Sequence, residues 1–534
     1  MEILKHIAPE WALKRKVSRM KLDALAHNDG GGYEGASKKR KIFKNWGTSG
    51  ADANDDLDIA APVMRERSRD LYKNTHIAAA ALDTKLQYVI GAGLIPEPVI
   101  NHAALGITLE QAEQLADEMK AIFMDWAESK ESDYQGLKNF FQKQRETYFC
   151  KNMNGTGVVL LPYVNDGELE SGHRIHTVEA DRLCNPESKK NTDRLRSGVE
   201  TDSRGRIKKI HIAKRMPNGP GKRLKRGDWQ AVSHKRANGW VNFLLVNNKA
   251  NRPGQYLGVP DLAPVVTAIK QLGQTVDAEL LASVISSKFT VFVTHKSPNG
   301  IANGLAPGGA MAGAAGTTQP ATDAQDSNEP IELNDGAIID LGTDEDVTIA
   351  DPTRPNPNLG PFMDKLATYI GSATGLPFEI LARHFTASYS ASKAALMMFA
   401  NWLAVERGEF IRDFCQPIYE MVIEEAAAQG RINLPGFFGD RQTRRAYLSC
   451  MWHGAPVGEI DEVKAATAAK IRLETRVTNR TIESRRHGLD QDQVRAVAAA
   501  EKRKDQEAGI LGATMSMVEP VEPTDQVDKD EPEE

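Results

Sequence analysis

The sequence predicts an α+β fold that is mainly helical. Several stretches repeat apolar residues every three or four positions, which is the period of an amphipathic helix. Between Val158 and Val246, short runs rich in β-branched residues alternate with Gly, Pro and Asn, which is typical of a small sheet. A chain of 534 residues is too long for one ordinary core. We therefore expect about three or four structural units.

The composition narrows the classes of function. Hydrophobic residues make up 41% of the chain and charged residues 26%, as in a globular protein. The formal net charge of -5 argues against a protein that coats nucleic acid through an excess of cations. The 4 cysteines form no C-x-x-C pair, so neither a zinc site nor a disulfide framework is indicated. No signal-peptide core and no apolar stretch of about 18 residues is present, so we expect a soluble, intracellular protein without a membrane partner.

The N-terminal part should be a basic arm followed by helices. Residues 1–50 combine basic clusters with three consecutive glycines, which favours a mobile arm. Helical periodicity starts at Ile59 and continues to a Gly-Ala-Gly stop at 91–93. Residues 109–128 form another amphipathic segment. This part should be mostly helix.

The sheet region carries a concentration of positive charge. Residues 204–236 hold twelve Lys or Arg and one acid, Asp228. Such a stretch is either a solvated surface or a contact to DNA or to an acidic neighbouring subunit. In the same region, His173 and His176 lie three apart on a predicted strand and should point to opposite faces. We expect ordinary surface histidines there, not a metal site.

Three long helices are expected after the sheet. The first spans 261–288, the second 358–375 and the third 392–429, where Pro417 lacks the N–H of the helical ladder and should cause a kink. Between the first two, a strand-like run precedes the Gly/Ala/Thr-rich stretch 302–329. That stretch has few side chains large enough to form a core, so it should be a flexible loop.

The C-terminal part divides into charged helices and an acidic tail. Residues 459–507 contain two alanine-rich helical patterns separated by His487-Gly488. Residues 518–534 carry eight acids and one lysine with no apolar period. The tail should therefore be disordered.

The turn before the third helix contains an S-x-x-K match, Ser390 to Lys393, which is the spacing of a serine nucleophile and an activating lysine. The S-D-N and K-T-G elements of such enzymes do not occur in the chain. His384 lies near Ser388 in sequence, but no acid in the loop could orient its ring. The chain also lacks G-x-x-x-x-G-K-[ST]. These patterns predict no catalyst and no cofactor, and they leave an assembly protein or scaffold.

Four strings in the same order resemble the portal proteins of tailed bacteriophages, of the lambda type. RERSRDLYKNTHIAAAALDTKLQYVIGAGL (65–94) is similar to that family's arginine-rich helix and its V-x-G-x-G-L stop. The passages at 176–213 and 252–266 are similar to its D-x-x-G-R and R-P-G-Q-x-x-G-V-P segments. GLPFEILARHFTASYSASKAALMMF (375–399) is similar to its Ser- and Tyr-rich entry into a long helix. The resemblance covers roughly residues 40–510.

This resemblance implies a ring with a central channel, built from a wing, stem, clip, tunnel loop and crown. The parts would be, in chain order, a mobile basic arm (1–50), the wing (51–257), the first stem helix (258–288), the clip (289–353) with its insert (302–329), the second stem helix (354–381), the tunnel loop (382–392), a long kinked wing helix and the segment after it (393–455), the crown helices (456–510) and the disordered acidic tail (511–534). The insert departs from the family pattern, so the family's docking surface cannot be transferred there residue by residue.

The resemblance also implies partners and a candidate site. Such portals are homo-oligomeric rings, usually 12-mers, at one vertex of the virion capsid. They assemble in the host bacterial cytoplasm, pass double-stranded DNA, and bind the terminase large subunit, a head-completion or adaptor protein, and the major capsid and scaffold proteins. Small hydroxyls and one or two cations would give weak contacts to the DNA backbone without gripping it. The tunnel-loop candidates are Arg383, His384, Ser388, Tyr389, Ser390 and Lys393. The alternative for these residues is contact with a neighbouring subunit.

Two other functions stay open from the sequence. One is a serine hydrolase that uses Ser390 and Lys393, which an activated-serine probe would label. The other is a non-ring scaffold that binds DNA through residues 204–236 and the basic arm. That protein would bind free duplex tightly and lose affinity steeply with salt.

Overall fold

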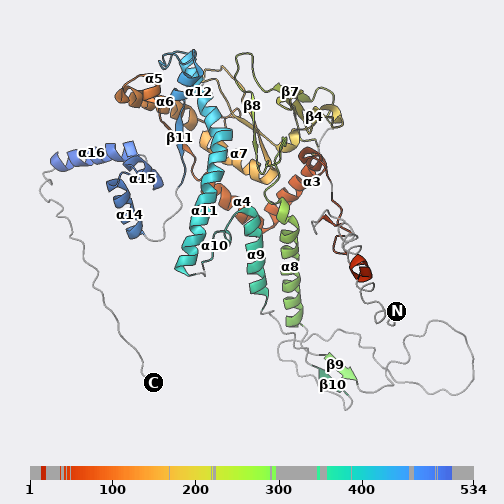
Figure 1. The fold of residues 1–534 in the computed structure, drawn as a ribbon. Coiled ribbons are helices and arrows are strands. Elements are labelled where there is room, and N and C mark those ends of the chain that lie inside the picture. Colours follow the sequence, from red (N-terminus) through yellow and green to blue (C-terminus); the bar gives the residue numbers. More distant parts are fainter. Residues whose placement is uncertain are drawn as a thin grey trace, which may run out of the picture.

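The computed structural model describes residues 14–19, 36–37, 41–43, 45–48, 50–167, 169–217, 219, 224–288, 292–295, 345–348, 358–385, 388–455, 462–487, 489 and 491–507. Within these ranges the protein is mainly helical with small antiparallel sheets, as predicted. Figure 1 shows a body of helices and sheets from which α8 and α9 project together. Most of the predicted N-terminal arm, the insert at 302–329 and the acidic tail lie outside the described residues.

The predicted first helix is in fact two helices, α3 (Ala53–Asn74) and α4 (His76–Val89). Thr75 separates them in an extended conformation, at φ -133° and ψ 124°. α3 also begins before Ile59, because the Asp52 side chain accepts hydrogen bonds from the N–H groups of Asn54 and Asp55. The break lets both helices bury apolar residues against the same neighbours, which local periodicity does not reveal.

Two further helices build the main core. α6 (Leu109–Glu128) has the predicted bounds and starts with a capping box formed by Thr108 and Gln111. The sequence does not predict α7 (Phe140–Asn154), because the side that it buries includes polar residues such as Lys143, Gln144 and Lys151 and so shows no apolar stripe. Phe123 of α6 and Phe140 of α7 pack edge to face, with ring centroids 5.3 Å apart. The short helix α5 (His102–Leu105) precedes α6.

The predicted small sheet is divided into two sheets. The first has the strand order β3 (His176–Val178), β2 (Thr156–Leu160), β8 (Phe243–Asn247), and the second has the order β4 (Leu195–Arg196), β5 (Val199–Thr201), β6 (Ile207–Ala213), β7 (Trp229–Ser233). Both are antiparallel, and each contributes residues to one buried cluster. A separate pair joins β1 (Ile95–Pro98) to β11 (Cys450–His453).

His173, which we expected at the surface, is buried with 1% of its surface exposed. It lies between the rings of Tyr163 and Trp240, at centroid distances of 5.3 and 4.6 Å. The segment that contains it pairs with Tyr163 in an isolated bridge and is covered by the aromatic residues. The period of a strand predicts that successive side chains point to opposite faces. It does not predict which other parts of the chain cover each face.

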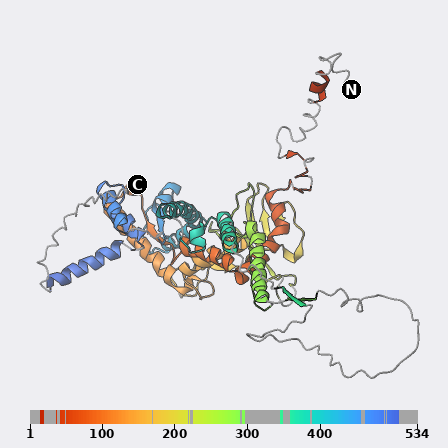
Figure 2. The same cartoon turned by 90° about the horizontal axis from the view of Figure 1, so that it is seen from below.

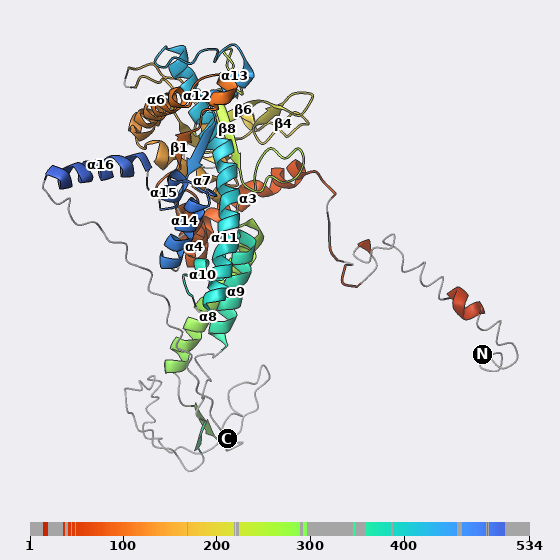
Figure 3. The ribbon, with the colours of Figure 1, turned by 60° about the vertical axis from the view of Figure 1, so that its left-hand side comes forward.

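α8 (Val266–Lys288) and α9 (Leu359–Thr374) lie side by side and project from the body (Figures 1 and 3). α8 begins five residues later than predicted, because residues 261–265 include a 3₁₀ turn (Ala263–Val265) that contains Pro264. The inner ends of the pair pack on α3 and α4 through Ile269, Leu272 and Ile370. Beyond the pair, β9 (Phe292–His295) and β10 (Glu345–Thr348) form an antiparallel ladder.

The third predicted helix is continuous over α11 (Tyr389–Phe410), a π turn (Ile411–Cys415) and α12 (Gln416–Ala428). The wide turn lies directly before Pro417, whose missing N–H interrupts the normal ladder. α11 starts at Tyr389, three residues before the predicted start, so it takes in residues that we expected in the preceding turn. The helix α13 (Arg441–Tyr447) follows.

The C-terminal helices are three where two patterns were predicted: α14 (Glu462–Glu474), α15 (Arg480–Arg486) and α16 (Gln491–Glu507). Seen from below, they lie on one side of the body and α8 lies on the other (Figure 2). The first pattern divides because the chain turns between α14 and α15, where Arg476 has a positive φ of 58°.

Candidate DNA-channel site

The site is the connection from α9 to α11, which a glycine and a short helix hold against the body. Gly375 ends α9 in the left-handed conformation, with φ 79°. A Cβ placed there would lie 2.8 Å from Nε1 of Trp402 in α11, so a side chain does not fit. The helix α10 (Phe378–Leu381) then buries Ile380 and Leu381 against α4.

Arg383 and His384 follow α10 directly. Arg383 has φ 52°, an unusual conformation for a residue with a side chain, and the His384 N–H donates to the Glu379 carbonyl at 3.1 Å. The chain therefore turns back at the end of α10, so the short helix ends there and both side chains are exposed. Neither makes a hydrogen bond or ion pair with the side chains of the other candidates within the described segments.

The remaining candidates lie at the start of α11. Ser388 is the N-cap residue, and its Oγ lies 3.3 Å from Oγ of Ser390. Ser388, Tyr389, Ser390 and Lys393 are all exposed, whereas Ser392 is buried. All six candidates thus belong to one exposed connection, but Tyr389, Ser390 and Lys393 are helical and do not lie in a loop.

This geometry does not build a serine nucleophile. Ser390 and Lys393 are both exposed in the first turns of α11, and no hydrogen bond joins them in the part of the chain that the structure describes. A nucleophilic hydroxyl needs a base within about 3 Å. What the segment offers is a row of hydroxyls and cations that face solvent.

Three charged residues that the sequence analysis missed anchor the site. Asp261 is fully buried and pairs with Lys85 Nζ at 2.6 Å and Lys249 Nζ at 2.9 Å. Burial alone would raise the pKa of Asp261, but the two ammonium groups outweigh it and the pKa is lowered. Lys249 also donates to the carbonyl of Ala373 in α9. Lys85 lies 5.0 Å from the ring centre of Trp402. The cluster ties together α4, the segment that leads into α8, the end of α9 and α11.

Arg407 fixes the other end of α11. Its Nε donates to the Val89 carbonyl at 2.9 Å, and its Nη2 donates to the carbonyls of Tyr88 and Ala455. Burial lowers the pKa of Arg407 to about 10, which leaves it charged at neutral pH. The guanidinium therefore caps the C-terminal carbonyls of α4 and holds the chain that leads to α14.

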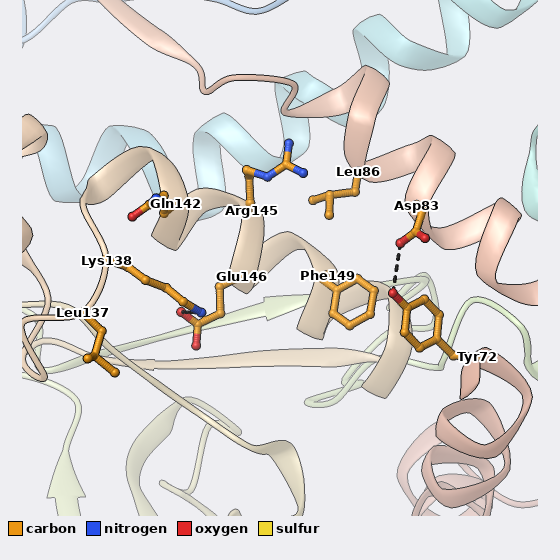
Figure 4. Close-up of a pocket in the computed structure, with 9 residues that line it drawn as sticks. All are labelled: Tyr72, Asp83, Leu86, Leu137, Lys138, Gln142, Arg145, Glu146 and Phe149. Carbon is orange, nitrogen blue, oxygen red and sulfur yellow. Dashed lines mark hydrogen bonds and ion pairs between the residues drawn. The ribbon is translucent and has the colours of Figure 1, made fainter. Parts of the chain in front are cut away.

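A cavity of about 590 Å³ lies between α3, α4 and α7 (Figure 4). Its polar groups already pair with one another or with the backbone: the Tyr72 hydroxyl donates to Asp83 at 3.1 Å, and Lys138 pairs with Glu146 at 3.1 Å. Arg145 donates to the Gly91 carbonyl. The cavity is therefore lined by polar groups that already have partners within the protein.

Among the described residues, no three His, Cys, Asp or Glu side chains come together in a way that could hold a metal ion. Nor does any helix within the described ranges combine the length and apolarity needed to cross a bilayer.

Comparison with known proteins decides the family. The sequence pattern of the phage portal protein, lambda family, matches residues 39–407, which include the whole candidate site. The chain belongs to this portal family. It is 20% identical over 456 residues to Portal protein B of Escherichia phage lambda, a match that covers 83% of this chain and 84% of that protein.

Two solved structures are also similar to this portal chain. A chain in the neck of an empty GTA particle, computed with C6 symmetry, has a TM-score of 0.42 and 11% identity, and the match covers 85% of this chain and 99% of that one. A chain in the neck of a native GTA particle, computed with C12 symmetry, has a TM-score of 0.39 and 11% identity, and the match covers 81% and 93%.

Family membership assigns this protein a structural portal role and not an enzymatic one. It gives no support to the serine hydrolase or to the non-ring scaffold. The S-x-x-K match is thus part of a helix start within the portal pattern.

Proposed function

We propose that copies of this portal protein close into a ring around a DNA channel. The observation that carries the proposal is a set of large apolar residues left exposed on the long helices of a single chain. They are Leu280 and Leu281 on α8, Phe362 and Tyr369 on α9, and Met397, Met398 and Val405 on α11, each more than half exposed. Exposed apolar residues on helices that are already packed on another side suit contact with a neighbouring subunit.

In this ring, α8 and α9 are the stem helices and the chain from 289 to 353 is the clip. The segment 51–257 is the wing, and α11 and α12 cross it. The helices α14, α15 and α16 are the crown. The projection of α8 and α9 from the body supports the stem assignment (Figure 3). We further propose a 12-mer, to which the C12 symmetry of one similar neck corresponds.

The α10–α11 connection is the proposed tunnel loop. Its exposed hydroxyls and cations suit weak contacts to the phosphates of a moving duplex, because each phosphate that is neutralised adds affinity and resists translocation. The clip is the proposed docking site of the terminase during packaging and of a head-completion protein afterwards. The place of action is the virion vertex, after assembly with the capsid and scaffold proteins in the host cytoplasm.

Electron microscopy of the purified protein, combined with native mass measurement, tests the ring. We expect rings with a central hole and a mass near twelve times 58.6 kDa. The double variant Leu280→Glu/Leu281→Glu should fail to close, because it places charge at the proposed interface. The double variant Gln114→Glu/Ala121→Glu adds the same charge at two exposed positions of α6 that carry no large apolar side chain, and this matched control should assemble normally.

A chain that stays monomeric even when it is co-expressed with its capsid and scaffold proteins would overturn the ring. If the α8 double variant formed normal rings, this would instead show that Leu280 and Leu281 of α8 are not part of the interface.

A further inference from the structure

A wide basic cleft lies between α5, the π turn, α12, α13 and the β7–β8 connection. Its volume is about 1010 Å³. Five cations line it, and the lining includes one acid, Glu420. The cations are Lys235, Arg412, Arg441, Arg444 and Arg445. All four arginines lie beyond residue 407, where the match to the portal family pattern ends. We call this site the basic cleft.

Most of this charge is unpaired. Arg444 forms an ion pair with Glu424 at 2.6 Å. Within the described part of the chain, Lys235, Arg412, Arg441 and Arg445 form no ion pair, and all four are exposed. Like charges held together around one concavity repel each other, and they focus a field that attracts a flexible anion.

The chain itself carries such an anion. Residues 519–534 hold eight acids and one lysine, so the segment is strongly negative. This acidic segment starts twelve residues after α16 ends at Glu507, and twelve extended residues reach about 40 Å. Linkage through the same chain or ring also gives the segment a high effective concentration at the cleft.

We propose that the acidic segment 519–534, from the same or a neighbouring copy, docks in the basic cleft. A concave site suits a thin peptide better than a stiff duplex, whose persistence length is about 50 nm. Docking neutralises cations that would otherwise hold DNA phosphates, so it reduces friction on DNA near the portal body. The docking itself does not depend on the ring and can be tested in either assembly state.

Zero-length carbodiimide cross-linking of the full chain tests the docking directly. Lys235 is the one lysine that lines the cleft, and the reagent joins an amine only to a carboxylate that touches it. After digestion and mass spectrometry, we expect bonds between Lys235 and acids in 519–534. Their yield should fall by about tenfold in about 1 M salt, where the Debye length is about 3 Å.

Matched charge variants show whether the cleft is responsible. The triple variant Arg412→Gln/Arg441→Gln/Arg445→Gln keeps Lys235 and the Arg444 pair, so it should fold while the cross-link yield falls by about tenfold. The control Arg204→Gln/Lys208→Gln/Arg226→Gln removes the same charge from exposed positions elsewhere and should leave the yield unchanged.

Three outcomes would overturn the proposal. In the first, the acidic segment links to the basic residues of 1–50 and not to Lys235. In the second, it links equally to exposed lysines across the body. In the third, the full chain binds duplex DNA through the cleft, so that the triple variant weakens DNA binding while the cross-links stay unchanged.

Discussion

Asp261 shows how a single buried charge can join several segments of this protein. Its carboxylate is fully buried between Lys85 and Lys249, and these contacts join α4, the segment that leads into α8 and the end of α9. A buried ion pair adds little to the free energy of unfolding compared with an apolar replacement. Removal of one partner, however, leaves the other charges buried without a counter-charge.

Asp261→Asn should therefore destabilise the protein by roughly 3 kcal/mol, because two ammonium groups lose their counter-charge. Urea unfolding measures this loss. The control Asp56→Asn removes a pair with Arg252 in which both side chains are about half exposed, and it should cost less than about 1 kcal/mol. Equal losses in the two variants would show that the Asp261 cluster is not a structural anchor.

The same residue predicts a loss of stability in acid. The folded pKa of Asp261 is below its ordinary value of 3.8, so its contribution is fully present above that value and is lost as the pH falls further. Unfolding measured from pH 5 to pH 2 should therefore be less pH-dependent in Asp261→Asn than in the wild type. An unchanged acid profile would contradict this assignment.

His173 affects the stability of the protein at a higher pH than Asp261 does. Burial lowers its pKa from 6.5 to about 4, although Glu425, with Oε2 at 3.8 Å from Nε2, partly opposes the shift. Between these values the unfolded chain binds a proton that the folded chain does not. The contribution of His173 to stability should thus fall as the pH drops from about 6.5 to 4. Below pH 4 this contribution should change little. In His173→Gln this slope should decrease, whereas in His102→Gln, an exposed control, it should persist.

At the scale of elements, the turns decide where the long helices lie. Thr75 divides one helical pattern into α3 and α4, the π turn carries α11 into α12, and Gly375 directs the chain from α9 to α10. Each is a short feature with a large effect on direction. The candidate site depends most on Gly375, because it lies against Trp402 of α11.

Gly375→Ala should be more destabilising than Gly106→Ala. Both glycines have positive φ, 79° and 68°, at the C-terminal ends of helices, so each change costs about 1 kcal/mol in backbone strain. A Cβ at Gly375 also meets Trp402, whereas nothing lies within 4 Å at Gly106. The extra contact should add about 1 to 3 kcal/mol, measurable as a larger fall in Tm. Similar Tm values would mean that Trp402 moves away without cost.

At the scale of the whole molecule, repetition in the proposed ring multiplies any change at the α10–α11 connection. One substitution in the chain becomes one in every copy around the channel. The wild-type connection combines a few cations with hydroxyls, and the chain has a net charge of -5. Both features suit a channel that does not hold DNA tightly.

Ser390→Arg should slow DNA packaging without preventing ring formation. Each added guanidinium neutralises a phosphate and strengthens DNA contact, and higher salt should partly restore the rate. Ser390→Asn is the control, with similar polarity and no charge. Packaging rates measured with the terminase at several salt concentrations test this. Equal packaging rates in both variants would show that Ser390 does not lie beside the DNA.

The sequence by itself determined the mainly helical class, the bounds of α6, the end of α9 near Gly375 and the connection between α9 and α11 to within a few residues. These features depend on local signals: apolar period, helix caps and glycine. The ordered family strings likewise read directly from the chain, and the portal assignment is confirmed by the family match.

Only the tertiary structure decided the rest. α7 has no apolar stripe because it buries polar side chains such as Lys143 and Lys151, and His173 is buried because Tyr163 and Trp240 enclose it. The Lys85–Asp261–Lys249 cluster and the basic cleft join residues that are up to about 350 positions apart. Such contacts depend on how distant segments pack together, and no local pattern in a single sequence records that.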